Sequence, residues 1–154
     1  MDEKEIIRCL RLVAERYDYE FAATIERLFR NETRHFKSGN FLITFSPGME
    51  AFSDLLPYGW SSLKNFWDIN KNLAPIGIYK QVENTSALLK SRGERKFIKF
   101  PTLEASMLSV AFLINSRGGN GGSWFSIQQS AIDAYNKELS KIIPRYINLI
   151  KPKQ

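Results

Sequence analysis

Apolar residues recur with the period of an α-helix in two stretches near the N-terminus. In residues 3–17 they form one stripe, made of Ile6, Leu10, Val13, Ala14 and Tyr17. Asp18 suits the N-cap of a second helix, because its carboxylate can accept hydrogen bonds from the free N–H groups of a first turn. The second stripe consists of Phe21, Ile25, Leu28 and Phe29. The pattern therefore predicts two successive amphipathic helices.

The helical period is lost after residue 35 and returns only in short pieces. Turn signals occur at 38–40 (Ser-Gly-Asn) and 46–48 (Ser-Pro-Gly), and a short helix is predicted over 60–67. Two strand-like runs, 76–82 and 95–100, flank the turn signal at 91–94. We expect them to pair as a small antiparallel sheet.

Two further helices are predicted in the C-terminal third. Pro101 and Thr102 open the first, which the glycine-rich run 117–122 ends. Ser126 and Gln129 have the spacing of a capping box for the last long helix, and Pro144 marks its end or a kink. The sequence thus predicts one α+β, mainly α domain over 1–154, with a β insertion at approximately 75–100.

The composition limits which kinds of metal site, disulfide and membrane segment the chain can form. With 154 residues, 44% of them apolar and 25% charged, the chain is typical of a globular domain. The lone Cys9 excludes an internal disulfide and a Cys-rich zinc site, and the lone His35 excludes multi-His metal chemistry. We expect no metal or cofactor. No apolar run is long enough for a transmembrane segment.

The net charge of +6 is unevenly distributed. Basic residues gather in 80–99 (Lys80, Lys90, Arg92, Arg95, Lys96 and Lys99) and again after residue 139. Such patches attract polyanions, including nucleic acid, acidic lipid surfaces and anionic cell-wall polymers, although they can equally be solvated faces. Charge alone does not choose the partner.

Glu32 is the most informative acidic residue. It follows Leu28 by four positions and Ile25 by seven, so it lies on the apolar stripe where the second helix ends. Partial burial there would favour the neutral carboxyl and raise its pKa, as a general acid working near neutral pH requires. The alternative is a structural glutamate that faces solvent or pairs with Arg30 or Arg34.

The segment around Glu32 resembles the lysozyme superfamily, in which a catalytic glutamate ends a helix beside a cleft between a helical lobe and a small β lobe. Here Asn31-Glu32-Thr33 is followed by an aromatic residue and a Ser/Gly loop. The resemblance extends in order over roughly residues 20–145, through 75–80, 97–106 and 124–142. It is closest to bacterial peptidoglycan N-acetylglucosaminidases of the flagellar and autolysin type, and to phage-type endolysins. A lysozyme-like fold with a substrate cleft is therefore expected.

The resemblance also implies site residues. Glu32 would be the general acid and Glu83, after the first strand, the second carboxylate, with Glu50 and Asp54 as rivals. The chain departs from the family at 33–36, where Thr-Arg-His-Phe replaces a Gly-containing motif.

Aromatic residues are expected to bind the glycan, because sugar rings stack on flat apolar faces. We assign this role to Tyr58, Trp60, Trp124 and Tyr135. Phe66 and Trp67 are predicted to be core, and His35 either to support the site without touching the substrate or to be structural.

We therefore expect a monomeric peptidoglycan hydrolase that cleaves β-1,4 bonds of an N-acetylglucosamine-containing glycan, as an N-acetylglucosaminidase or a muramidase. The N-terminus resembles neither a secretion signal nor a transit peptide. Synthesis in the cytoplasm is expected, with access to the wall through helper export, injection or lysis. The alternatives are an inactive glycan-binding or structural component of a phage or secretion assembly, and a basic nucleic-acid-binding module, although no nucleic-acid partner is expected.

Overall fold

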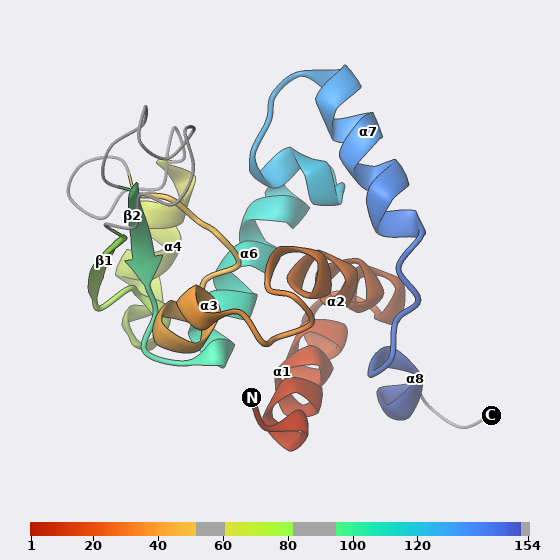
Figure 1. The fold of residues 1–154 in the computed structure, drawn as a ribbon, viewed down its shortest axis with the longest axis horizontal. Coiled ribbons are helices and arrows are strands. Elements are labelled where there is room, and N and C mark those ends of the chain that lie inside the picture. The colour runs from red at the N-terminus through yellow and green to blue at the C-terminus, as the bar shows by residue number, and fades with distance from the viewer. Residues whose placement is uncertain (52–60, 82–94, 152–154) are drawn as a thin grey trace.

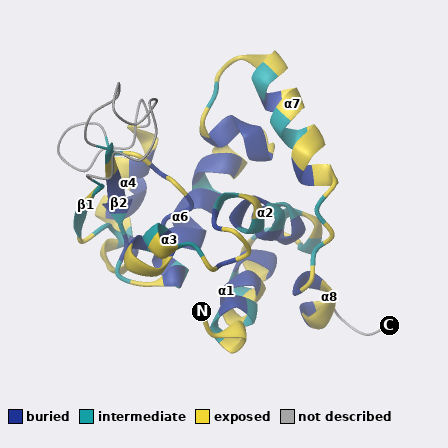
Figure 2. Cartoon of the chain, viewed as in Figure 1, coloured by how far each residue is buried: buried dark blue, intermediate teal, exposed yellow. Residues whose placement is uncertain are grey.

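Helices pack around α6 (Leu103–Ser116), which is buried along almost its whole length (Figures 1 and 2). The computed structural model describes residues 1–51, 61–81 and 95–151. Against α6 pack α1 (Glu3–Arg16), α2 (Tyr19–Glu32), α4 (Ser62–Ile69) and the 3₁₀ turns η1 (Lys71–Leu73) and η2 (Gly121–Trp124). Because α6 is apolar on every side, it forms the centre of the core.

The two N-terminal helices confirm the periodicity argument. Both begin as predicted, and Asp18 accepts a hydrogen bond from the Phe21 N–H at 2.7 Å. Thr102 caps α6 in the same way, through the Ala105 N–H at 3.0 Å. Phe66 and Trp67 are 5% and 7% exposed, so their assignment to the core is also confirmed.

The β insertion is a hairpin-like pair of strands, β1 (Gly77–Gln81) and β2 (Arg95–Lys99). They pair antiparallel, from Gly77 opposite Lys99 to Gln81 opposite Arg95. Residues 49–51 run along the other side of β2, where the Ile98 N–H donates to the Met49 carbonyl at 2.9 Å. The α+β, mainly α class is therefore confirmed, with its sheet inside the predicted interval.

Two local predictions were wrong. Ser126 and Gln129 do not form a capping box, because α7 (Gln129–Ser140) begins only at Gln129 and Gln128 occupies its N-cap. Ser126 instead accepts from the Gln128 N–H at 3.1 Å, in the turn that precedes the helix. The turn signal at 38–40 hides a short helix, α3 (Gly39–Thr44), which forms because Phe41 and Thr44 are buried.

The C-terminal segment is attached to α2 by a buried carboxylate. Glu26 is 0% exposed and accepts hydrogen bonds from three consecutive N–H groups, those of Arg145, Tyr146 and Ile147, at 2.5, 2.9 and 2.8 Å. These groups open α8 (Ile147–Ile150), so Glu26 satisfies donors that the short helix cannot pair itself. No helix in the described part of the chain is long and apolar enough to cross a membrane.

Candidate active site

Glu32 is the last residue of α2, and the chain turns sharply after it. Thr33 is buried; its hydroxyl donates to the Phe29 carbonyl at 2.5 Å and accepts from the Phe36 N–H at 2.7 Å. The three residues that follow Thr33 all have positive φ: 51° at Arg34, 59° at His35 and 68° at Phe36. Such backbone is costly for residues other than glycine and is typical of functional sites. The turn ends the helix abruptly and leaves the Glu32 side chain at its margin.

The Glu32 carboxyl is hydrogen-bonded to a residue 103 positions away. The Tyr135 hydroxyl, on α7, donates to Glu32 Oε1 at 2.5 Å. Asn31 Nδ2 donates to the same oxygen at 3.4 Å and to the Tyr135 hydroxyl at 3.5 Å. Both donors address one oxygen, so the carboxyl is held in a fixed orientation.

Burial dominates the proton affinity of this group. Desolvation raises the pKa of Glu32 above its ordinary value, and the hydrogen bonds from Tyr135 and Asn31 offset only part of that rise. The pKa of Tyr135 is also raised, first by burial and then by the charge of Glu32. The tyrosine therefore stays protonated and remains a donor, while Glu32 keeps its proton to higher pH than a free glutamate.

The second carboxyl oxygen lies beside a glycine. A Cβ at Gly48 would be 3.9 Å from Glu32 Oε2 and 3.8 Å from the Trp124 ring, and the φ of Gly48 is +92°. Trp124 is 5% exposed, so little of its surface is open to a ligand. Its neighbour Phe125 is 48% exposed and makes an edge-on contact with the Tyr135 ring at 4.9 Å.

A cavity of about 560 Å³ opens in front of Glu32, between the end of α2, α3 and the β hairpin. Its lining is mainly polar and comprises Glu32, Arg34, Ser38, Gly39, Asn40, Phe41, Thr44, Ser46, Gly48, Gln81, Arg95 and Phe97. The amide of Asn40 donates to Gln81 Oε1 at 3.2 Å, which ties α3 to β1. The volume lies within the range of small-ligand sites.

The hairpin side of the cavity carries a charged pair. Arg95 binds Glu50, with its Nε 2.9 Å from Oε1, and its guanidinium lies 4.8 Å from the centre of the Phe97 ring. Arg34 comes from the opposite wall and forms no ion pair with any residue in the ranges that the structure covers. Both arginines give the cavity a positive character.

The structure brings together three of the residues predicted from sequence: Glu32, Tyr135 and Trp124. Glu83, Tyr58 and Trp60 lie outside the described residues, as does Asp54, so their roles stay predictions. Glu50 is not among the lining residues, and within the described lining Glu32 is the single carboxylate.

His35 does not reach the Glu32 carboxyl. Its Nδ1 accepts from Arg30 Nε at 3.0 Å, and it lines a different cavity. This contact is consistent with the structural role that the sequence suggested for it.

Sequence reasoning missed four contributors to the site: Asn31, Arg34, Gly48 and Arg95. The turn signal at 46–48 was a usable clue to Gly48, since a glycine after Ser-Pro indicates positive φ. Nothing local indicated that Arg34 and Arg95, 61 positions apart in sequence, line one cavity.

No group of His, Cys, Asp or Glu side chains within residues 1–51, 61–81 and 95–151 is arranged to hold a metal ion. Comparisons of the chain with protein-family models, with curated proteins and with solved structures found no match.

Proposed function

We propose that this protein hydrolyses β-1,4 glycosidic bonds of cell-wall glycan, with Glu32 as the general acid. The observation that carries the proposal is a half-buried carboxyl with a raised pKa, oriented by Tyr135 at 2.5 Å and placed at the wall of a polar cavity. A carboxylic acid that remains protonated towards neutral pH is what protonation of a leaving glycosidic oxygen requires.

The hydrogen bonds indicate which oxygen carries the proton. Oε1 accepts from Tyr135 and Asn31, so the transferable proton belongs on Oε2, beside Gly48. In the reaction, Glu32 gives this proton to the oxygen that links two sugars, and the bond from that oxygen to the anomeric carbon breaks. Water adds to the anomeric carbon and releases a proton, so that one bond and one water molecule yield two hydroxyl groups.

Glu83 stays the predicted second carboxylate, with Glu50 and Asp54 as the alternatives. Its task would be to activate the water or to stabilise the positive charge at the anomeric carbon. The ion pair of Glu50 with Arg95 argues against Glu50, because its carboxylate is already engaged by the guanidinium and is not among the lining residues. Arg34 and Arg95 would favour an anionic wall glycan in the cavity.

The test is Glu32→Gln, which preserves shape but has no proton to give. Turnover of purified peptidoglycan should fall by about 10²–10⁴-fold, the usual contribution of general acid catalysis. Mass spectrometry of the wild-type digest identifies the new reducing end as N-acetylglucosamine or N-acetylmuramic acid. Circular dichroism and binding to insoluble wall should be unchanged, because the helix end and the lining remain.

The matched control is Glu138→Gln, on the exposed side of α7, whose side chain is 63% exposed. It should retain full turnover. A Glu32→Gln protein that still cleaves the glycan refutes the assignment, and so does a wild-type protein that produces no reducing ends. If Glu32→Gln loses helical signal, Tyr135→Phe replaces it, and an unaltered pH profile for that variant also counts against the proposal.

A further inference from the structure

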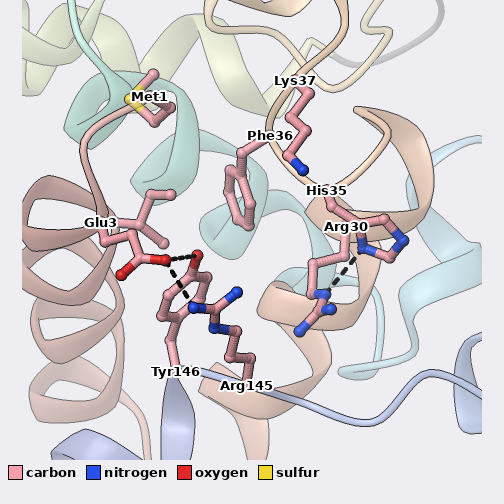
Figure 3. A pocket seen from close by; sticks show the side chains of 9 residues that line it. Met1, Glu3, Arg30, His35, Phe36, Lys37, Arg145 and Tyr146 are labelled. Carbon is pink, nitrogen blue, oxygen red and sulfur yellow. Dashed lines mark hydrogen bonds and ion pairs between the residues drawn. The ribbon is translucent and has the colours of Figure 1, made fainter.

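A second cavity, of about 340 Å³, is lined in part by the loop that follows Glu32. Arg34 and Ser38 line the Glu32 cavity, whereas the three residues between them, 35–37, line the second cavity. Figure 3 shows this second cavity. Its described lining consists of Met1, Glu3, Ile6, Arg30, His35, Phe36, Lys37, Arg145 and Tyr146. Glycan cleavage as proposed above makes no use of it.

Arg30 is the fixed cation of this cavity. Its side chain is only 18% exposed, and its Nε donates to His35 Nδ1 at 3.0 Å. Its Nη1 lies 3.3 Å from the Ile143 carbonyl and 3.4 Å from Glu26. Glu26 already accepts three backbone N–H bonds, so Arg30 is one of several groups that balance that carboxylate.

Arg145 is held more loosely. Its Nη2 is 2.9 Å from Glu3, but the two side chains are 63% and 56% exposed. Such exposed pairs contribute little, because both groups remain hydrated. The guanidinium also lies 5.5 Å from the centre of the Tyr146 ring. A stronger anion in the cavity could therefore replace Glu3 as the partner of Arg145 without loss of the fold.

Lys37 is the third cation that lines this cavity. In Figure 3 it comes from the same side as His35 and Arg30, with Glu3 on the other side of the view. It forms no ion pair with any residue in the covered ranges. Among the described lining residues, three permanent cations thus accompany one carboxylate. Buried Ile6 and Phe36 form apolar parts of the wall, where charges are less screened than in water.

We propose that this cavity binds a phosphate group, as a phosphomonoester or a phosphodiester. The loosely held Arg145 suits the tetrahedral oxygens, since its planar fork can donate two parallel hydrogen bonds, and Arg30 and Lys37 add positive charge. The bound group would contact His35 and Lys37, and it would thereby brace the left-handed turn that follows Glu32.

The test uses inorganic phosphate as the probe and the thermal midpoint of the full chain as the readout. Phosphate is titrated against chloride at constant ionic strength, so that general screening is held fixed. At ten times its dissociation constant, phosphate should raise the midpoint of the wild type by about 3–6 °C. The double variant Lys37→Gln/Arg145→Gln should lose this rise, because both side chains are exposed and their removal leaves the core intact.

The matched control is Lys64→Gln/Arg11→Gln, which removes two exposed cations away from this cavity and should respond to phosphate like the wild type. Glycerol 3-phosphate and dimethyl phosphate then separate the sources. A larger shift with the monoester indicates a small metabolite, and a larger shift with the diester indicates a polymer backbone. No rise for the wild type, or equal rises for the wild type and the cavity variant, overturns the proposal. Because no glycan is present, either result is independent of the role of Glu32.

Discussion

The helical wall of the Glu32 cavity holds a half-buried carboxyl that is hydrogen-bonded to uncharged groups, whereas the hairpin side carries a partly exposed ion pair. On the helical side, hydrogen bonds of 2.5–3.5 Å join the side chains of Glu32, Tyr135 and Asn31. On the hairpin side, Arg95 and Glu50 are 29% and 44% exposed in their side chains. The half-buried carboxyl and the partly exposed ion pair therefore experience different dielectric surroundings.

This difference explains where chemistry can reside. A carboxyl that loses water on folding, as Glu32 does, changes its proton affinity. A partly exposed ion pair such as that of Glu50 with Arg95 contributes little to stability. We therefore assign proton transfer to the helical wall alone, and electrostatic attraction of the glycan to Arg95 on the hairpin wall together with Arg34. Substitutions on the two walls should differ accordingly.

The largest effect on stability is expected for Gly122→Ala, in η2, which packs against α7 behind the helical wall. A Cβ there would lie 2.8 Å from the Cα and the carbonyl oxygen of Ile132, and backbone atoms cannot move aside independently. The free energy of unfolding should fall by about 1–3 kcal/mol, as is usual for overpacking. Displacement of α7 should also separate Tyr135 from Glu32 and reduce turnover.

Chemical denaturation measures the effect, and Gly77→Ala is its counterpart on the hairpin. No atom lies within 4 Å of a Cβ at Gly77, so its stability should change by no more than about 0.5 kcal/mol. Equal losses for the two variants would contradict the distinction between a tightly packed wall and an open one.

Tyr135→Phe should produce the next largest effect. The hydroxyl favours the ionised form of Glu32, so its removal raises the pKa of Glu32 further. The alkaline limb of the pH–rate profile should therefore move to higher pH, and stability should fall by about 0.5–1.5 kcal/mol through the lost hydrogen bond. Packing of the ring against Phe125 is retained.

Tyr79→Phe, in β1, is the control for this experiment on the hairpin. It should leave the alkaline limb where it is in the wild type. A limb that moves to lower pH in Tyr135→Phe, or does not move, would mean that Glu32 is not the group whose protonation limits the rate.

Much of the helical wall could be predicted because its signals are local. Asp18 and Thr102 cap their helices through residues three positions away, and the stripe that ends at Glu32 is visible within one helix. Partial burial of Glu32 followed from that stripe alone.

What could not be predicted depends on distant contacts. The bond between Glu32 and Tyr135 spans 103 positions, and its geometry comes from the packing of α7 against α2. Glu26 lies one turn from Arg30 and outside the predicted apolar stripe, and it is buried because a segment about 120 residues later supplies its donors. The capping-box prediction failed for the opposite reason. The Ser126 hydroxyl accepts a hydrogen bond from the nearby Gln128 N–H, in the turn before the helix begins.

The stability of the wild type should depend on pH through Glu32. The unfolded chain releases the Glu32 proton near the ordinary pKa of 4.5, while the folded protein retains it to higher pH. In that interval the folded state binds more protons, so this contribution to stability is lost as pH rises through the folded pKa. The Glu32→Gln variant lacks this pH-dependent contribution, because its amide does not titrate.

The midpoint of Glu32→Gln relative to the wild type should therefore increase from pH 4 to pH 8, which parallel thermal unfolding at each pH measures. A difference that is constant or that decreases would contradict a raised pKa for Glu32, and with it the main contrast between the walls.

The smallest effect is expected for Glu50→Gln, which lies beside β2 and pairs with Arg95 of the cavity lining. Its ion pair with Arg95 is partly exposed, so the free energy of unfolding should change by about 0.2–1 kcal/mol. Removal of the carboxylate leaves Arg95 with more net positive potential towards the cavity, so KM for an anionic glycan should fall slightly while kcat stays the same. This gain should disappear at high salt, where the Debye length shortens to about 3 Å at 1 M. Arg95→Gln should change KM in the opposite direction.

A loss of turnover by about 10²-fold or more in Glu50→Gln, with the fold intact, would instead place Glu50 among the reacting groups. The second carboxylate would then lie on the hairpin wall, and proton transfer would no longer belong to the helical wall alone.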